Sequence, residues 1–128
     1  MAIAMRYGTQ GESSGAVSGS SGGGVTCDLL WTNPNPDSNF SAQTVTLDLS
    51  AYDAVLVVVR LVATTQYHNT NICMVGLTAI LNGVDTSGAR YARTADVTTT
   101  GIVFGQGYAA GTANARNAVP ENIYGIKF

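Results

Sequence analysis

The sequence predicts an all-β protein, an antiparallel β-sandwich or jelly-roll-like barrel. A valine-rich run at residues 54–62 has the composition of a buried strand, because β-branched side chains pack well on a pleated sheet and lose χ1 freedom in a helix. Roughly six to eight short apolar segments follow one another with turn residues between them. No stretch of about eleven residues shows a helical period, which argues against helices.

The chain divides into an extended, Gly/Ser-rich N-terminal arm, residues 1–24, and one β-sandwich domain, residues 25–128. A chain of 128 residues has the size of a single domain. Such a domain buries roughly two-thirds of the surface of its unfolded chain.

The arm combines a linker with an apolar start. Residues 8–24 are almost wholly glycine, serine and small polar types, which is the composition of a linker. Ile3, Met5 and Tyr7 precede this linker. We expect these three side chains to anchor the arm as it runs along neighbouring subunits of an assembly.

The sandwich domain is predicted to open with a strand at residues 25–31. A rigid turn follows at residues 32–37, because two prolines fix φ there and push the residues before them into extended conformations. Residues 44–49 alternate between apolar and polar types, so that the valine and the two leucines share one face of a second strand.

The run at residues 54–62 is predicted to be the central strand of the core. It lacks the alternation of a strand with one solvated face, so both of its faces should be covered. One set of side chains is expected to face the partner sheet, and the other to lie beneath the arm or a neighbouring subunit. Arg60 is expected near a rim or beside a carboxylate such as Asp48 or Asp53, because an unpaired buried charge is costly.

Further turns and strands are predicted after the central strand. Residues 64–71 are expected to form a loop, and residues 72–81 a second long apolar run that is broken by Gly76. The pair Asn82-Gly83 is typical of a tight turn between strands.

The last third of the chain is predicted to begin with a hairpin of residues 90–97 and 101–104, joined through three threonines. Residues 105–118 are rich in glycine, alanine and asparagine and are expected to be a loop or an irregular edge. A strand at residues 123–128 follows.

The charge content favours a surface covered by partners. Charged residues make up 11% of the chain and hydrophobic ones 45%, with a net charge of −2. A typical soluble domain has about 25% charged residues, and proteins with little net charge tend to associate. The six Lys and Arg residues are scattered, so nucleic acid is not expected as a partner.

We expect synthesis in the cytoplasm and no membrane partner. The N-terminus lacks the apolar run of a signal peptide, and no stretch approaches the length of a membrane span. Cys27 and Cys73 are therefore expected to be buried thiols rather than a disulfide. Two cysteines with one histidine do not make a zinc site, so neither a metal nor a cofactor is expected.

Two patterns imitate active sites without their context. Gly105–Ala110 resembles a dinucleotide-binding loop, but the helix, second parallel strand and acidic residue of that motif are missing. The glycines are expected to allow close packing or a bulge instead. Asp48 and Asp53 have the residue type of a hydrolase's paired carboxylates, but their placement around a turn favours turn capping. The lone His68 has no nucleophile beside it, and the sequence predicts that the protein is not an enzyme.

A ligand-binding tip at residues 64–71 is the alternative. Tyr67 has a ring that stacks on a sugar, and His68, Asn69 and Asn71 have groups that hydrogen-bond its hydroxyls. This predicts a carbohydrate- or host-receptor-binding module. Four further side chains are expected to extend such a tip: Arg90, Tyr91, Arg93 and Tyr108.

Three segments resemble small structural proteins of tailed bacteriophages and prophages of Gram-positive hosts. They are residues 30–36 (LWTNPNP), the segments 40–45 (FSAQTV) and 47–53 (LDLSAYD), and residues 119–127 (VPENIYGIK). The resemblance implies a virion component, either a capsid decoration, head-fibre, baseplate or tail-fibre module, commonly built as a β-rich homotrimer with other virion proteins as partners. It assigns no functional residue.

Overall fold

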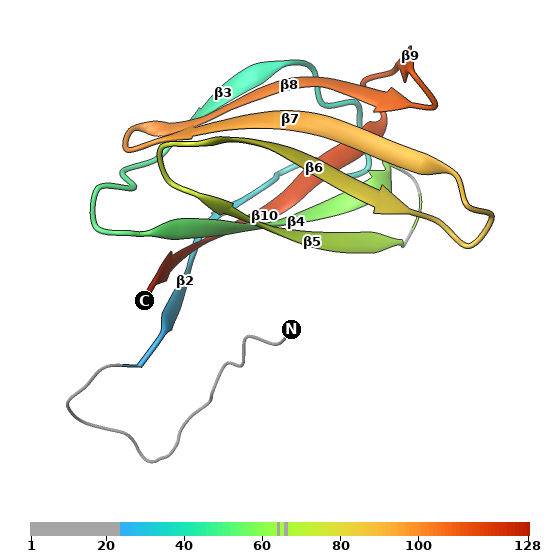
Figure 1. Cartoon of the computed structure of the whole chain (residues 1–128). Helices are drawn as coiled ribbons and strands as arrows, with labels where there is room; N and C mark the ends of the chain where they lie inside the picture. Colours follow the sequence, from blue (N-terminus) through green and yellow to red (C-terminus); the bar gives the residue numbers. More distant parts are fainter. Residues whose placement is uncertain (1–23, 64, 66) are drawn as a thin grey trace.

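The computed structural model describes residues 24–63, 65 and 67–128 as two antiparallel sheets packed as a sandwich (Figure 1). The all-β prediction is therefore confirmed, with a sandwich as the architecture. The described residues include no helix, and hence none with the length and apolarity of a membrane span. The anchor residues Ile3, Met5 and Tyr7 lie outside the described part of the chain, as does the predicted arm apart from Gly24.

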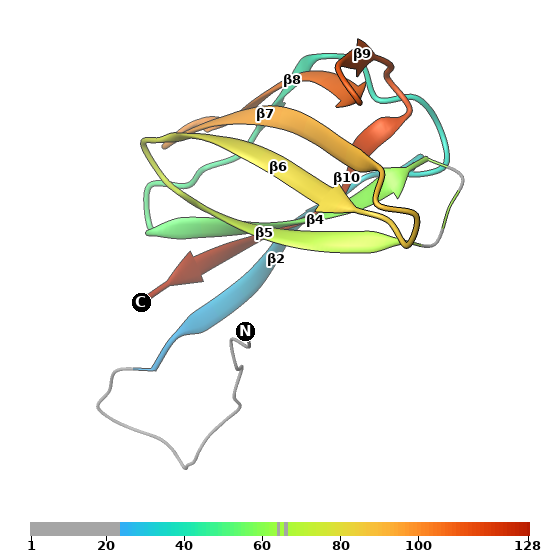
Figure 2. The same ribbon diagram turned by 45° about the vertical axis from the view of Figure 1, so that its right-hand side comes forward.

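The first sheet has the strand order β2-β10-β4-β5. Its strands are β2 (Thr26–Thr32), β4 (Ala54–Val62), β5 (His68–Met74) and β10 (Asn117–Lys127). The predicted central strand is confirmed as β4, which has a neighbour on each side. The last described strand, β10, lies between β2 and β4, so the sheet joins the two ends of the domain (Figure 2).

The second sheet has the strand order β3-β8-β7-β6. Its strands are β3 (Gln43–Thr46), β6 (Thr78–Val84), β7 (Arg90–Thr98), β8 (Gly101–Ala109) and the short β9 (Thr112–Ala113), which pairs with β8. The predicted hairpin is confirmed as β7 and β8, which turn at Thr99 and Thr100.

The core fills the space between the two sheets. The odd-numbered side chains of β4, from Val55 to Leu61, are at most 3% exposed, whereas its even-numbered side chains from Leu56 to Val62 are half-buried on the opposite face. Phe40 contacts Phe104 edge to face, with ring centroids 5.5 Å apart. One set of β4 side chains thus faces the partner sheet as predicted, and the described residues leave the other set partly open.

Several predicted boundaries are wrong. The strand predicted at residues 44–49 ends at Thr46, and the strand predicted at residues 123–128 begins already at Asn117. Residues 68–71 belong to strand β5 and not to a loop, Asn82 and Gly83 lie within β6, and residues 105–109 continue β8. The chain turns instead at residues 75–77 and 85–88. Pairing with β7 and close packing on Leu61 therefore outweigh the local turn preference of the Asn-Gly pair, since a Cβ at Gly83 would overlap the Leu61 side chain.

The two actual turns have their own local causes. Gly76 takes a φ of 98°, a conformation that side chains with a Cβ rarely adopt. In the second turn the Asp85 carboxylate accepts hydrogen bonds from the backbone N–H groups of Ser87 at 2.8 Å and Ala89 at 3.1 Å. An aspartate that binds the backbone two residues ahead is a common turn device.

The glycines of β8 allow close packing, which confirms the structural interpretation of the Gly105–Ala110 pattern. A Cβ at Gly105 would overlap the Thr94 hydroxyl, and one at Gly107 would overlap the Asn117 carbonyl. The β7–β8 register also shifts between Arg93 and Ala95. This irregular region lets β8 approach the start of β10.

Candidate functional surface

The outer face of the first sheet carries a row of apolar side chains across all four strands. Leu29 on β2 pairs with Tyr124 on β10, Tyr124 pairs with Leu56 on β4, and Leu56 pairs with Ile72 on β5. Directly opposed residues project from the same face of a sheet. Leu29 is 55% exposed and Ile72 47%, so the two ends of the row are open to solvent.

A second apolar row lies beside the first. Cys27 pairs with Ile126, Ile126 with Ala54, and Ala54 with Met74. Cys27 and Met74 are exposed, whereas Ile126 and Ala54 are buried. The two rows together are called the outer apolar face, and their members are Cys27, Leu29, Ala54, Leu56, Ile72, Met74, Tyr124 and Ile126.

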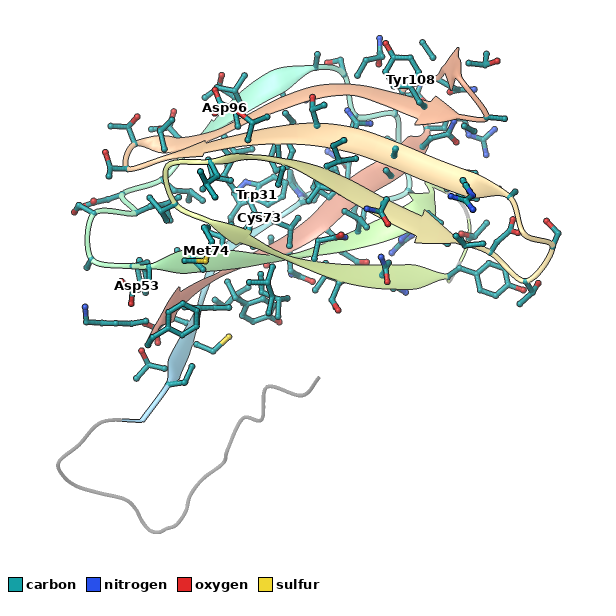
Figure 3. The ribbon with its side chains drawn as sticks, viewed as in Figure 1. Trp31, Asp53, Cys73, Met74, Asp96 and Tyr108 are labelled. Carbon is teal, nitrogen blue, oxygen red and sulfur yellow. The ribbon has the colours of Figure 1, made fainter. Side chains whose placement is uncertain are left out.

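The outer side of the second sheet differs in composition. Its exposed Val103 lies in a row between Thr44 and Asp96, and Ile80 pairs with Thr94. Figure 3 shows Asp96 and Tyr108 on this outer side, and Trp31 and Cys73 between the sheets. Val103 and Ile80 thus lie beside polar residues, and Tyr108 lies between the small side chains of Ala92 and Ala113. Among the described residues, rows of large apolar side chains that cross four strands occur on the first sheet.

A charged cluster forms one end of the outer face of the first sheet. Arg60 forms an ion pair with Glu121, with Nη2 and Oε2 3.1 Å apart, and a second one with Asp37. His68 Nε2 lies 2.6 Å from the other oxygen of Glu121. Burial tends to raise the pKa of Glu121, but the hydrogen bonds from Arg60 and His68 outweigh it and lower that pKa.

Arg60 thus meets carboxylates as expected, but they are not Asp48 or Asp53. Asp48 accepts hydrogen bonds from the Ser50 hydroxyl at 2.6 Å and the Ser50 N–H at 3.1 Å, so its predicted role in turn capping is confirmed. These bonds also lower the pKa of Asp48. Asp53 accepts a hydrogen bond from the Phe128 N–H at 2.8 Å.

The structure separates the four residues of the predicted ligand-binding tip. Tyr67 is 52% exposed, and His68 pairs with Arg60 on the outer face. Asn69 and Asn71 pair with the core residues Val59 and Val57, and therefore project to the opposite side of β5.

Asn69 and Asn71 connect the two sheets. The Asn69 side-chain amide donates to the carbonyl of Asn82 on β6, and the Asn82 N–H donates to the Asn71 side-chain oxygen at 3.4 Å. Asn82 lies on an edge strand, whose outward N–H and C=O groups would otherwise be free. The sequence signal for this contact was the alternation of Asn69 and Asn71 along a strand. It was missed because residues 64–71 were predicted to be a loop.

Arg93, one of the side chains expected to extend the tip, lies in the core instead. Arg93 is 1% exposed and donates to the carbonyls of Gly105 at 2.7 Å, Ala118 at 2.9 Å and Asn117 at 2.9 Å. Burial lowers the pKa of Arg93 to about 10. The prediction that Arg93 belongs to a surface tip is wrong, since its apolar neighbours and its carbonyl partners place it in the core.

The other three side chains lie on β7 and β8 of the second sheet. Tyr91 donates its hydroxyl to Asp85 at 2.9 Å. Tyr108 lies on the outer side of the second sheet and is 41% exposed (Figure 3). Arg90 is exposed and pairs with Val84 on β6.

Both cysteines are free thiols, but only one is buried. Cys73 lies in the core, and burial raises its pKa to about 11. Cys27 is exposed on β2, contrary to the prediction, because no sheet among the described residues covers the outer face of this edge strand. Among the residues that the structure describes, no group of three or more His, Cys, Asp or Glu side chains has the arrangement of a metal site.

Comparison of the chain with protein-family models, with curated proteins and with solved structures found no match.

Proposed function

We propose that this chain is a non-catalytic structural subunit of a tailed-bacteriophage virion that assembles as a homotrimer through the outer apolar face of the first sheet. The observation that carries the proposal is the four-strand apolar row from Leu29 to Ile72, which is open at both ends. Contiguous apolar surface rimmed by polar groups is typical of an interaction site.

A second copy of the chain is the occupant that the charges favour. Arg60 pairs with Asp37 and Glu121 inside its own subunit, so its positive charge needs no carboxylate from a partner. The whole chain has only 11% charged residues. Interfaces between permanent subunits resemble a domain core cut in half, and the outer apolar face has that composition.

The assignment to a virion rests on the sequence resemblance at residues 30–36, 40–45, 47–53 and 119–127. The resemblance implies a capsid decoration, head-fibre, baseplate or tail-fibre module, with the arm of residues 1–24 as the docking segment. A non-catalytic role is supported by the contacts of the three side chains that were considered as catalytic candidates, because each of them already binds another group of the chain. Asp48 caps a turn, Asp53 binds the backbone of Phe128, and His68 contacts Glu121.

Substitution on each sheet tests the oligomer. Ile72→Lys places a charge in the apolar row, and Ile80→Lys is the matched control because Ile80 is 61% exposed on the other sheet. Analytical ultracentrifugation should show a trimer for the original protein and for Ile80→Lys, and a dissociation constant at least about tenfold higher for Ile72→Lys, which corresponds to about 1.4 kcal/mol. A monomeric original protein at micromolar concentration, or equal effects of both substitutions, would contradict the proposed interface.

A particle assay tests the virion assignment. Deletion of residues 1–24 should leave a folded β domain that no longer incorporates into phage particles. Normal incorporation of the truncated protein would show that the arm is not the docking segment.

The carbohydrate- or host-receptor-binding module stays a prediction. Of its four residues, only Tyr67 and His68 project where a ligand reaches them without breaking the contacts of Asn69 and Asn71 to Asn82. Tyr67→Ala combined with His68→Ala should abolish glycan binding or adsorption if this alternative holds, and should leave assembly unchanged if the protein is only structural.

A further inference from the structure

Strand β6 contains the dipeptide of this chain that is most prone to a spontaneous backbone reaction. Of the nine asparagines in the sequence, only Asn82 is followed by a glycine. The backbone nitrogen of a glycine is easy to approach, because the residue has no Cβ. An Asn-Gly pair in a flexible turn, which its local sequence favours, therefore deamidates readily.

The reaction has a nucleophile and a leaving group within the same dipeptide. The backbone nitrogen of Gly83 gives its proton to a base from solvent and forms a bond to Cγ of Asn82. The side-chain nitrogen of Asn82 takes up a proton and leaves as ammonia, so that a five-membered succinimide ring remains. Water then opens the ring at one of its two carbonyl carbons, which gives either an aspartate or an isoaspartate in place of the asparagine.

The second sheet holds the attacking nitrogen. The backbone N–H and C=O of Asn82 point toward β5, where they bind the side chains of Asn71 and Asn69. Backbone groups of successive residues in a strand point to opposite sides. Those of Gly83 therefore point toward β7, where its partner is Tyr91. Gly83 is also buried, so its N–H is both paired and shielded from a base in solvent.

The side chain of Asn82 is held away from that nitrogen. Its Nδ2 donates to the carbonyl oxygen of Ile80 at 3.1 Å, which turns the side-chain amide toward the preceding residues and not toward Gly83. Asn82 itself is exposed, so water reaches the side chain. The barrier to the reaction is therefore the extended conformation of β6.

We propose that Asn82 is a modification site that the fold keeps closed, and that it deamidates when β6 detaches from β7. Detachment frees the Gly83 nitrogen and the Asn82 side chain together. The strand at the end of a sheet opens locally at a lower free energy than its centre, and β6 is the end strand of the described second sheet. An isoaspartate adds one carbon to the backbone, so an edge that has reacted cannot close again in its original register.

This site is independent of the outer apolar face, because β6 belongs to the other sheet. Peptide mapping of the full chain by mass spectrometry tests it, with incubation in mildly alkaline buffer and in the same buffer with urea. Asn82 should deamidate at least about tenfold more slowly in the folded chain than in urea. Equal rates in the two conditions, or no reaction in urea, would overturn the proposal.

Variants of β5 test whether the asparagine contacts keep the site closed. Asn69→Ala combined with Asn71→Ala should raise the rate in the folded chain several-fold and leave the rate in urea unchanged. The matched control is Thr70→Ala, because Thr70 is exposed on the opposite face of β5, and its rates should equal those of the original protein. An unchanged folded rate in the double variant, with its fold verified by circular dichroism, would refute the role of these contacts. If the double variant does not fold, the comparison of the original protein in buffer and in urea decides.

Discussion

The side chain of Arg93 holds the backbone of Ala118, where Nε donates to the carbonyl oxygen at 2.9 Å. Ala118 is fully buried and has a φ of 48°, a left-handed conformation that costs a non-glycine residue about 1–2 kcal/mol. Arg93 belongs to β7 of the second sheet and Ala118 to β10 of the first. The guanidinium thus joins the two sheets through backbone carbonyls.

Removal of this guanidinium should strongly destabilise the protein. Arg93→Met would leave the carbonyls of Gly105, Asn117 and Ala118 without their donor, and buried unsatisfied groups cost about 1–3 kcal/mol each. We expect the free energy of unfolding to fall by about 3 kcal/mol or more in urea denaturation. Arg93→Lys should recover little of it, because an ammonium lacks the planar fork of donors. The exposed Arg90 provides the control, and Arg90→Met should change stability by less than about 0.5 kcal/mol.

Gly107 should tolerate no side chain. A Cβ there would overlap the Asn117 carbonyl and approach Arg93 Nη2 to 2.7 Å, and both groups are fixed by the Arg93 contacts. Gly107→Ala is expected to cost at least about 1–3 kcal/mol. Gly105→Ala is the comparison, because its obstacle is the Thr94 hydroxyl, and a second substitution, Thr94→Ala, should relieve that clash. Thermal unfolding of the three variants would contradict this account if Gly105→Ala proved the more damaging single change.

The Asn71 side chain should protect one particular amide. Because Asn71 accepts a hydrogen bond from the Asn82 N–H, Asn71→Ala should accelerate hydrogen exchange of that amide several-fold. Asn69 donates to the Asn82 carbonyl instead, so Asn69→Ala should have a smaller effect on the same amide. Residue-resolved exchange by NMR separates the two, and equal acceleration in both variants would mean that the whole β6 edge opens.

The turn at Asp85 should lose its contribution to stability in acid. Hydrogen bonds from the Ser87 hydroxyl, the backbone N–H groups and the Tyr91 hydroxyl lower the pKa of Asp85 from 3.8 to about 2. A carboxylate with a depressed pKa stabilises the folded state above its unfolded pKa, and this contribution is lost as the pH falls through about 2. Ser87→Ala should therefore move the Asp85 titration midpoint, followed by carboxyl-carbon NMR, upward toward 3.8. The neighbouring Thr86→Ala should leave it in place, and an unchanged midpoint in Ser87→Ala would refute the assignment.

The strands that alternation or valine content predicted are found in the structure. The run at residues 54–62 coincides with β4, and the predicted first strand differs from β2 by one residue. These strands could be predicted because the β-branching of the valines and the alternation of apolar and polar residues are properties of the segment's own sequence.

The features that sequence reasoning missed depend on distant partners. Asn82-Gly83 has a turn preference, but its pairing with Ala92 and Tyr91 keeps it within a strand. Arg93 looked like a surface cation because its carbonyl partners lie between 12 and 25 residues away along the chain. The sequence predicted only part of the outer apolar face, because the run at 54–62 indicated that both faces of its strand are covered. The residues that β2, β10 and β5 add to this face could not be predicted, since they depend on the strand order.

The position of β10 constrains how the domain folds during synthesis. This strand is the last one described, yet it forms the middle of the first sheet and supplies the core residues Val119 and Ile123. Until it leaves the ribosome, β2 lacks the partner that it has among the described strands, and β4 lacks one neighbour, so the first sheet stays incomplete. Pairing of the first and last strands also gives the fold a high contact order, which slows folding. The edge of β4 that pairs with β10 therefore stays unpaired until residues 117–127 have left the ribosome.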